Sequence, residues 1–163
     1  LQLRDQVRRL ADVERARRHE EDVVAKNPNL VIIYIGINDV WHKTSSRTGT
    51  DADKFERFYT ALIKKIQKAN AQVVICTPTV IGEKFDNSNE NDGDLNAYSA
   101  IIKKIAKDNS VQLIDLRKAF MDYEAKNNIE NNNKVNLDPA REWEINSKGA
   151  RRHDKSVFLF NIL

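Results

Sequence analysis

Four side chains able to do chemistry lie within five residues of one another: Asn38, Asp39, Trp41 and His42. Together they offer an amide that donates hydrogen bonds without titrating, a carboxylate, an indole and an imidazole. This combination is a candidate ligand or catalytic site. A structural interpretation is equally open, because Asn and Asp side chains also stabilise the turns that lead into helices.

The elements around these residues would hold them at one edge of a sheet. The run Leu30–Ile35 is apolar, rich in β-branched residues and preceded by Asn27-Pro28-Asn29. This pattern predicts a strand buried on both faces inside a parallel sheet. The run stops at Gly36, so residues 38–42 are expected in a loop at the carboxyl end of the strand. Ligands of open α/β sheets bind at that end.

Further strands and amphipathic helices are predicted along the chain. Buried strands are expected over residues 72–77 and 111–115, and a long loop, of a length that is often functional, follows the first of them to about residue 92. Helices are predicted over residues 1–26, 52–69, from 94 onward, over 116–125 and over 146–163, with an asparagine-rich loop over 127–136.

The alternation of strands with amphipathic helices predicts an α/β fold. The expected architecture is a three-layer α/β/α sandwich of flavodoxin-like type with a parallel sheet, in a single domain over residues 1–163. The helix over residues 52–69 would cover the sheet with an apolar stripe made of Phe55, Phe58, Tyr59, Leu62, Ile63 and Ile66.

Composition excludes several classes of protein. The chain has 163 residues and a net charge of +3 that is spread along it, so no basic nucleic-acid footprint is evident. No apolar run approaches the roughly 20 residues that span a bilayer. No secretory signal pattern is present at the start, which is Leu1, and the localisation stays open. The single cysteine, Cys76, is expected to be a small buried hydrophobe.

No metal or cofactor is predicted. The three histidines, His19, His42 and His153, are far apart and lack the spacing of metal ligands. The sequence also has no glycine-rich phosphate loop, so a nucleotide cofactor is not expected.

The segment around Asn38 resembles a known family. Gly36-Ile37-Asn38-Asp39 after an apolar strand is similar to the G-x-N-D block of the SGNH hydrolases, also called the GDSL esterase/lipase family. The similarity extends in order and spacing over EEDVVAKNPNLVIIYIGINDVWH, QVVICTPTVIGEK and VQLIDLRKAF. It covers Glu20 to about Lys126 and lapses at both ends.

The resemblance implies an ester hydrolase that transfers an acyl group to a serine, which a histidine activates and an aspartate orients. In this pattern Asn38 matches the side chain that donates to the oxyanion, a role that suits a fixed amide dipole. Gly36 and Asp39 are its neighbours, and Asp39 is expected to hold the loop by accepting backbone N–H groups.

The resemblance also implies a mouth for a small-molecule ester substrate. Trp41, His42 and the start of the loop Thr77–Gly82, with Thr77 as its first residue, are expected to line one concavity with Asn38. His42 as the catalytic base is the less favoured alternative.

Other blocks of the family are missing or altered. No Gly-Asp-Ser occurs in the chain, and only one predicted helix precedes the strand Leu30–Ile35, so the nucleophile strand is absent. Counting back from Asn146 places Arg141 and Glu144 where the family has Asp-x-x-His. A guanidinium stays protonated and a carboxylate is a poor base at neutral pH. We therefore expect an N-terminally incomplete domain that lacks the first strand and is inactive by itself.

Two other functions stay open. The chain could be a non-catalytic relative that holds a carbohydrate ester or another small ligand near Asn38. It could also be an interaction module, because the family pairs its nucleophile strand with the G-x-N-D strand, and loss of that partner would leave Leu30–Ile35 as an unguarded edge. Such an edge is expected to form a homodimer or to recruit another strand.

Overall fold

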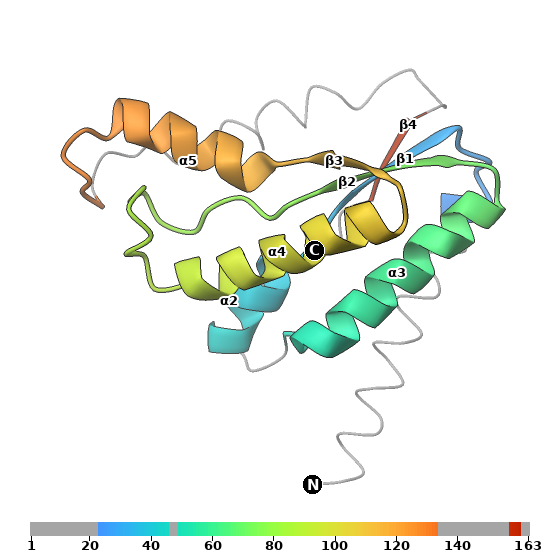
Figure 1. Ribbon diagram of the computed structural model, residues 1–163, viewed down its shortest axis with the longest axis horizontal. Helices are drawn as coiled ribbons and strands as arrows, with labels where there is room; N and C mark the ends of the chain where they lie inside the picture. The colour runs from blue at the N-terminus through green and yellow to red at the C-terminus, as the bar shows by residue number, and fades with distance from the viewer. Residues whose placement is uncertain (1–22, 46–48, 134–156, 161–163) are drawn as a thin grey trace, which may run out of the picture.

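A four-stranded parallel sheet forms one layer of the structure, with helices against one of its faces (Figure 1). The computed structural model describes residues 23–45, 49–133 and 157–160. The strands lie in the order β3-β2-β1-β4, and every neighbouring pair is parallel. Their bounds are Leu30–Tyr34 for β1, Gln72–Cys76 for β2, Gln112–Ile114 for β3 and Val157–Phe160 for β4.

Helices follow the first three strands. Their bounds are Ile37–Ser45 for α2, Ala52–Lys68 for α3, Asp92–Asp108 for α4 and Leu116–Asn127 for α5. Helices α3 and α4 lie side by side on one face of the sheet, and α5 runs on from the carboxyl end of β3 (Figure 1). The prediction of an α/β fold with a parallel sheet is confirmed.

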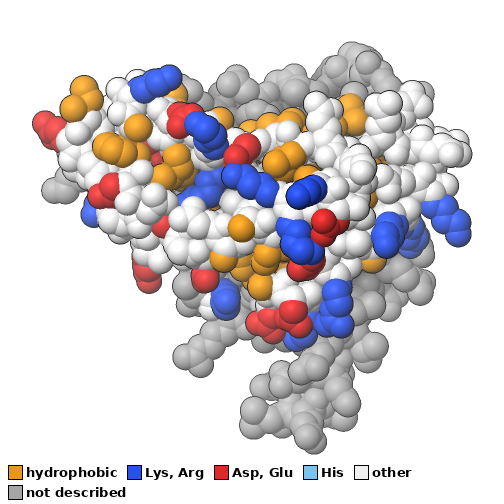
Figure 2. All heavy atoms as spheres, in the orientation of Figure 1, with side chains coloured by type: hydrophobic (Ala, Val, Ile, Leu, Met, Phe, Trp, Pro, Cys, Tyr) orange, Lys and Arg blue, Asp and Glu red, His pale blue; other side chains and the backbone are white. Residues whose placement is uncertain are grey.

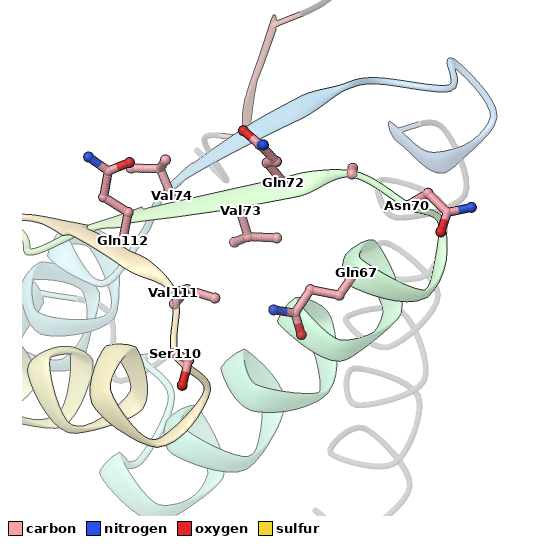
Figure 3. A pocket seen from close by; sticks show the side chains of 9 residues that line it. Gln67, Asn70, Gln72, Val73, Val74, Ser110, Val111 and Gln112 are labelled. Atoms are coloured by element: carbon pink, nitrogen blue, oxygen red, sulfur yellow. The ribbon is translucent and has the colours of Figure 1, made fainter.

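Side chains alternate between the two faces of the sheet. In β1, Val31 and Ile33 are fully buried, whereas the other three residues of the strand are partly exposed. In β2, Val73 points toward the helices, while Gln72 and Val74 point to the opposite face (Figure 3). Strand β1 is therefore fully buried on one face and not on both, because α3 and α4 are the described helices that pack on the sheet and they share that face.

An aromatic cluster occupies the core between the sheet and these two helices. Phe55 contacts Tyr59 and Tyr98 edge to face, with ring centroids 5.5 and 5.0 Å apart. The Tyr59 hydroxyl donates to the Ile33 carbonyl at 3.2 Å, which connects α3 to β1. Phe58, predicted to be part of the buried stripe, is 39% exposed. It lies at the margin of the stripe, which covers only part of the circumference of a helix.

Residues 37–45 form helix α2, where the sequence predicted a loop. The first turn closes when the Val40 N–H donates to the Gly36 carbonyl at 3.2 Å. Asp39 in the first turn and Lys43 in the last turn both complement the helix dipole. The polar residues that suggested a loop are thus compatible with a short helix.

The C-terminal prediction is corrected in two respects. Val157–Phe160 is a strand and not part of a helix, and the rest of that predicted helix lies outside the described residues, as does most of the helix predicted over residues 1–26. Strand β4 pairs with Leu30–Ile33 of β1. The expectation that Leu30–Ile35 is an open edge is therefore wrong, and a homodimer through it loses its basis, because that side of β1 already has a backbone partner.

The strand order creates a switch point beside β1. The chain proceeds from β1 to β2 to β3 on one side, whereas β4 lies on the other side of β1. In parallel sheets of this kind, ligands bind outside the carboxyl ends of the strands at such a point. Gly36 and helix α2 follow the carboxyl end of β1 and are therefore located there.

The surface formed by α3, α4 and α5 carries acidic and basic side chains interspersed with one another (Figure 2). Exposed ion pairs join Lys104 to Glu56 at 2.6 Å and Lys118 to Asp122 at 2.6 Å. Pairs of this kind contribute little to stability. Within the described ranges, no helix has the length and apolar character needed to cross a membrane.

Candidate functional site

Gly36 makes the sharp connection between β1 and α2. Its φ angle is 112°, a conformation that side chains with a Cβ rarely adopt. A Cβ at this position would also lie 3.3 Å from Cζ of Phe55. The glycine thus allows the chain to turn closely over the aromatic core, which fixes where α2 begins.

Asp39 and Tyr98 hold both backbone groups of Thr50. The Asp39 carboxylate accepts a hydrogen bond from the Thr50 N–H at 3.1 Å, and the Tyr98 hydroxyl donates to the Thr50 carbonyl. Burial raises the pKa of Tyr98 to about 12, with a further contribution from the nearby Asp39 carboxylate. The expectation that Asp39 accepts a backbone N–H is confirmed, and its partner lies eleven residues away and not in its own turn.

Asn38, Trp41 and His42 share one side of α2. Residues three and four positions apart are neighbours on a helix surface, so the amide of Asn38 lies on the same side as the two rings. Asn38 and His42 are partly buried, whereas Trp41 is 55% exposed. The Trp41 and His42 rings are tilted by 43°, with centroids 5.8 Å apart. An exposed indole beside a partly buried amide is a suitable surface for a ligand with both apolar and polar faces.

Thr77 is at the same edge of the sheet but is not on the surface. It is fully buried, its hydroxyl donates to the Asp115 carboxylate at 3.0 Å, and the same oxygen accepts from the Arg117 N–H at 3.0 Å. The hydroxyl therefore uses its single donor and one of its acceptor lone pairs within the protein. The geometry gives Thr77 a role in joining the ends of β2 and β3.

A buried ion pair lies next to Thr77 and was not anticipated from the sequence. The Arg117 guanidinium donates to the Asp92 carboxylate at 2.9 Å, and the two side chains are 5% and 1% exposed. The sequence signal that could have located this ion pair is the position of the residues. Thr77 and Asp115 each follow a parallel strand, so both are expected at the same edge of the sheet. Arg117 is two residues further along the chain than Asp115.

The asparagine-rich segment after α5 also has a defined role. The Asn128 side chain, 1% exposed, donates to the Glu83 carbonyl at 2.6 Å. The Asn131 side chain accepts from the Phe85 N–H at 3.0 Å. These bonds connect the segment after α5 to residues 83–85, the middle of the long loop after β2. Over residues 128–133 the prediction of a loop is confirmed, whereas Asn127 still belongs to α5 and residues 134–136 lie outside the described residues. The composition did not reveal the partner of this loop.

The pocket in Figure 3 lies at the opposite edge of the sheet, where β2 and β3 begin. It is open to solvent, and none of the described residues that line it is charged or titratable. Its polar lining comes from Gln67, Asn70, Gln72, Ser110 and Gln112. These side chains can supply hydrogen bonds but neither an acid nor a base. The carboxyl edge of the sheet, with Asn38, is therefore a better candidate site than this pocket.

Cys76 is a buried thiol in β2. Cys76 is 3% exposed, and burial raises the pKa of its thiol to about 11, as expected for a buried hydrophobe. In the part of the chain that the structure describes, no three or more His, Cys, Asp or Glu side chains are grouped so that they could hold a metal ion.

The chain matches a family described as the GDSL-like lipase/acylhydrolase family over residues 5–131. A curated relative, an acetylxylan esterase from Geobacillus stearothermophilus, is 29% identical over 110 residues, which are 63% of this chain and 48% of the relative. This chain thus spans about half the length of that protein.

Two solved structures of esterases are also similar to this chain. The acetyl xylan esterase AlAXEase, known from a crystal structure, is 60% identical in sequence and has a TM-score of 0.69. The match covers 71% of this chain and 59% of the AlAXEase chain. A mutant of Axe2, an acetyl-xylooligosaccharide esterase from Geobacillus, is 25% identical with a TM-score of 0.59, covering 65% of this chain and 49% of its own.

Proposed function

Because the chain belongs to the GDSL-like lipase/acylhydrolase family, we propose that it is the oxyanion-bearing part of a serine-type ester hydrolase. We further propose that its substrates are acetyl esters on xylan or xylo-oligosaccharides. The substrate class rests on the esterase at 60% identity, together with the more distant acetylxylan esterases.

The observation that carries the proposal is the location of Asn38. It lies in the first turn of α2, directly after the carboxyl end of β1 and at the switch point of the sheet. The side-chain amide would donate to the oxygen of the ester carbonyl as negative charge develops there. Gly36 and Asp39 support this role, because Gly36 sets the start of α2 and Asp39 bonds to the Thr50 N–H.

Two other side chains of α2 would bind the substrate. Trp41 would contact a sugar ring through its exposed face, and His42 would line the mouth beside it. Thr77 would not contact the substrate, because it is fully buried and its hydroxyl bonds to the Asp115 carboxylate and the Arg117 backbone N–H.

The chain as printed is expected to be catalytically inactive by itself. It contains no Gly-Asp-Ser, and Arg141 and Glu144 occupy the positions of the Asp-x-x-His block. We therefore expect no hydrolysis of 4-nitrophenyl acetate or acetylated xylobiose above an albumin control. Turnover that disappears in Asn38→Ala would contradict this expectation and indicate a nucleophile elsewhere in the chain.

Binding tests the proposal without requiring turnover. An NMR titration of the ¹⁵N-labelled chain with a peracetylated methyl xyloside should shift the Asn38 side-chain amide and the Trp41 indole signals. The unacetylated xyloside is the matched ligand control and should shift the indole more than the amide. Asn38→Asp keeps the size of the side chain but replaces its donor with an acceptor, so it should weaken binding of the acetylated ligand alone. Equal binding of both ligands to the wild type and to Asn38→Asp would contradict an ester-recognising role.

A further inference from the structure

The loop between β2 and α4, residues 77–91, is held in place although it has no helix or strand. Loops of this length are normally mobile or functional. Here the residues from Thr77 to Val80 are buried, and side chains from three other segments bond to the loop. The loop is therefore part of the fixed structure at the carboxyl edge of the sheet.

Arg117 is the main anchor of this loop. Its guanidinium donates to the Thr79 carbonyl at 3.1 Å through Nη1 and to the Asp92 carboxylate at 2.9 Å through Nη2. Nη2 also lies 3.4 Å from the Asp92 carbonyl, and Nε donates to the Asn96 side chain at 2.6 Å. One planar group thus contacts the loop near its start and the first turns of α4 after its end.

Thr79 connects this anchor to β1. Its side-chain oxygen lies 2.9 Å from the Tyr34 hydroxyl. Tyr34 is the last residue of β1 and precedes Gly36 by two positions. A continuous series of contacts therefore runs from Arg117 through Thr79 and Tyr34 to the strand end that leads into α2.

The chemistry of the Arg117 guanidinium indicates that it positions other groups more than it stabilises the fold. A buried ion pair often contributes no more to stability than apolar residues of similar volume would. A guanidinium, however, presents donors in several fixed directions of one plane, which a lysine cannot do. Three acceptors use those directions here: Thr79 in the loop, and Asp92 and Asn96 in α4.

We infer that Arg117 is a positioning residue of the candidate site. Through Thr79 and Tyr34 it sets the arrangement of the Asn38 side-chain amide. The part of this inference that concerns ligand binding rests on the proposed function. The part that concerns the arrangement of Asn38 does not, because the NMR signals of its side-chain amide report on it directly.

The test compares Arg117→Lys with Ile105→Val. The lysine keeps the charge beside Asp92 but loses the fork of donors, whereas Ile105 is a core residue of α4, 1% exposed, near the other end of the helix. Both changes lower stability, so Ile105→Val controls for a general loss. Tyr34→Phe is the second variant, because it removes only the hydroxyl that contacts Thr79 and leaves the buried charges intact.

Two readouts decide the inference. The Asn89 N–H donates to the Asp92 carboxylate at 2.8 Å, and the Lys84 N–H donates to the Asn89 side chain at 3.3 Å, so both amides report on the carboxylate that Arg117 holds. Hydrogen exchange at these two amides should accelerate at least about tenfold relative to Val31 in Arg117→Lys, about 1.4 kcal/mol of local opening. The ratio should be unchanged in Ile105→Val. The Asn38 side-chain amide signals should shift in Arg117→Lys and in Tyr34→Phe but not in Ile105→Val.

Unshifted Asn38 signals in both test variants would overturn the inference, even if the loop exchanged faster, since Arg117 would then be structural only. Shifts of equal size in Ile105→Val would overturn it as well. If the wild-type chain fails to bind the peracetylated methyl xyloside, the proposed function fails, while the Asn38 signals still decide the positioning role of Arg117.

Discussion

The carboxylate of Asp39 accepts the Thr50 N–H at 3.1 Å, while the Tyr98 hydroxyl donates to the carbonyl of the same residue. Both backbone groups of Thr50 are thus held by side chains of two different helices, α2 and α4. Tyr98 also packs edge to face on Phe55, over which Gly36 turns. The start of α2 and Thr50 are therefore held by one connected set of contacts.

Replacing Asp39 should show how much this contact contributes. Asp39→Ala removes the acceptor and leaves the Thr50 N–H without it, so we expect a loss of about 1–2 kcal/mol in the free energy of unfolding. Asp39→Asn keeps an acceptor oxygen and should cost clearly less. Urea unfolding followed by circular dichroism measures both values. Equal losses in the two variants would show that the charge, and not the hydrogen bond, is what matters.

Gly36→Ala should be destabilising. The substitution forces alanine into a φ of 112° with its Cβ 3.3 Å from Phe55, and strain of this kind costs on the order of 1–3 kcal/mol. Gly93→Ala is the matched control, because Gly93 lies in α4 with no atom within 4 Å of the added Cβ. The control should be stabilised by about 0.5–1 kcal/mol. Thermal unfolding midpoints that fall in both variants would contradict this account.

Cys76 should be unreactive in the native protein. Burial raises the pKa of its thiol to about 11, and the thiolate is the reactive form. Labelling with a chromogenic disulfide reagent near pH 8 should therefore be much slower for the folded chain than for the chain unfolded in urea. Similar labelling rates in the two states would show that β2 opens readily.

Asp115 should make stability depend on pH in the acid range. Burial raises the pKa of its carboxyl, but hydrogen bonds from Lys103, the Lys118 N–H and the Thr77 hydroxyl together outweigh it, so the folded pKa lies below the ordinary 3.8. The group therefore contributes stability above about pH 4, and this contribution is lost as the pH falls through the folded pKa.

The measurement is the urea midpoint of the wild type and of Asp115→Asn at about pH 6 and about pH 3. At the higher pH the wild type should be more stable than Asp115→Asn. At the lower pH the difference in stability between the two proteins should be smaller. Asp122→Asn is the control, since its exposed pair with Lys118 should contribute little at either pH. A difference that grows on acidification would contradict the assigned direction.

Helix α2 illustrates the limit of reading a short polar segment. Residues 38–42 follow a strand and a glycine, which located the candidate site at the carboxyl end of β1 correctly. Their polarity, however, could not distinguish a loop from a nine-residue helix. The helix forms because Gly36 turns tightly on Phe55 and Asp39 bonds to Thr50, and these partners become neighbours only in the fold.

The sequence by itself determined the strands β1 and β2, the helices α3 and α4 and the location of Asn38 after a strand, because apolar periodicity and glycine placement are local signals. The tertiary structure decided what pairs with β1, which face of the sheet is covered and why Thr77 is buried. It also placed Arg117 between Thr79, Asp92 and Asn96. Such contacts join residues up to 38 positions apart, and the cost of burying a charge is met only when all of those segments have come together.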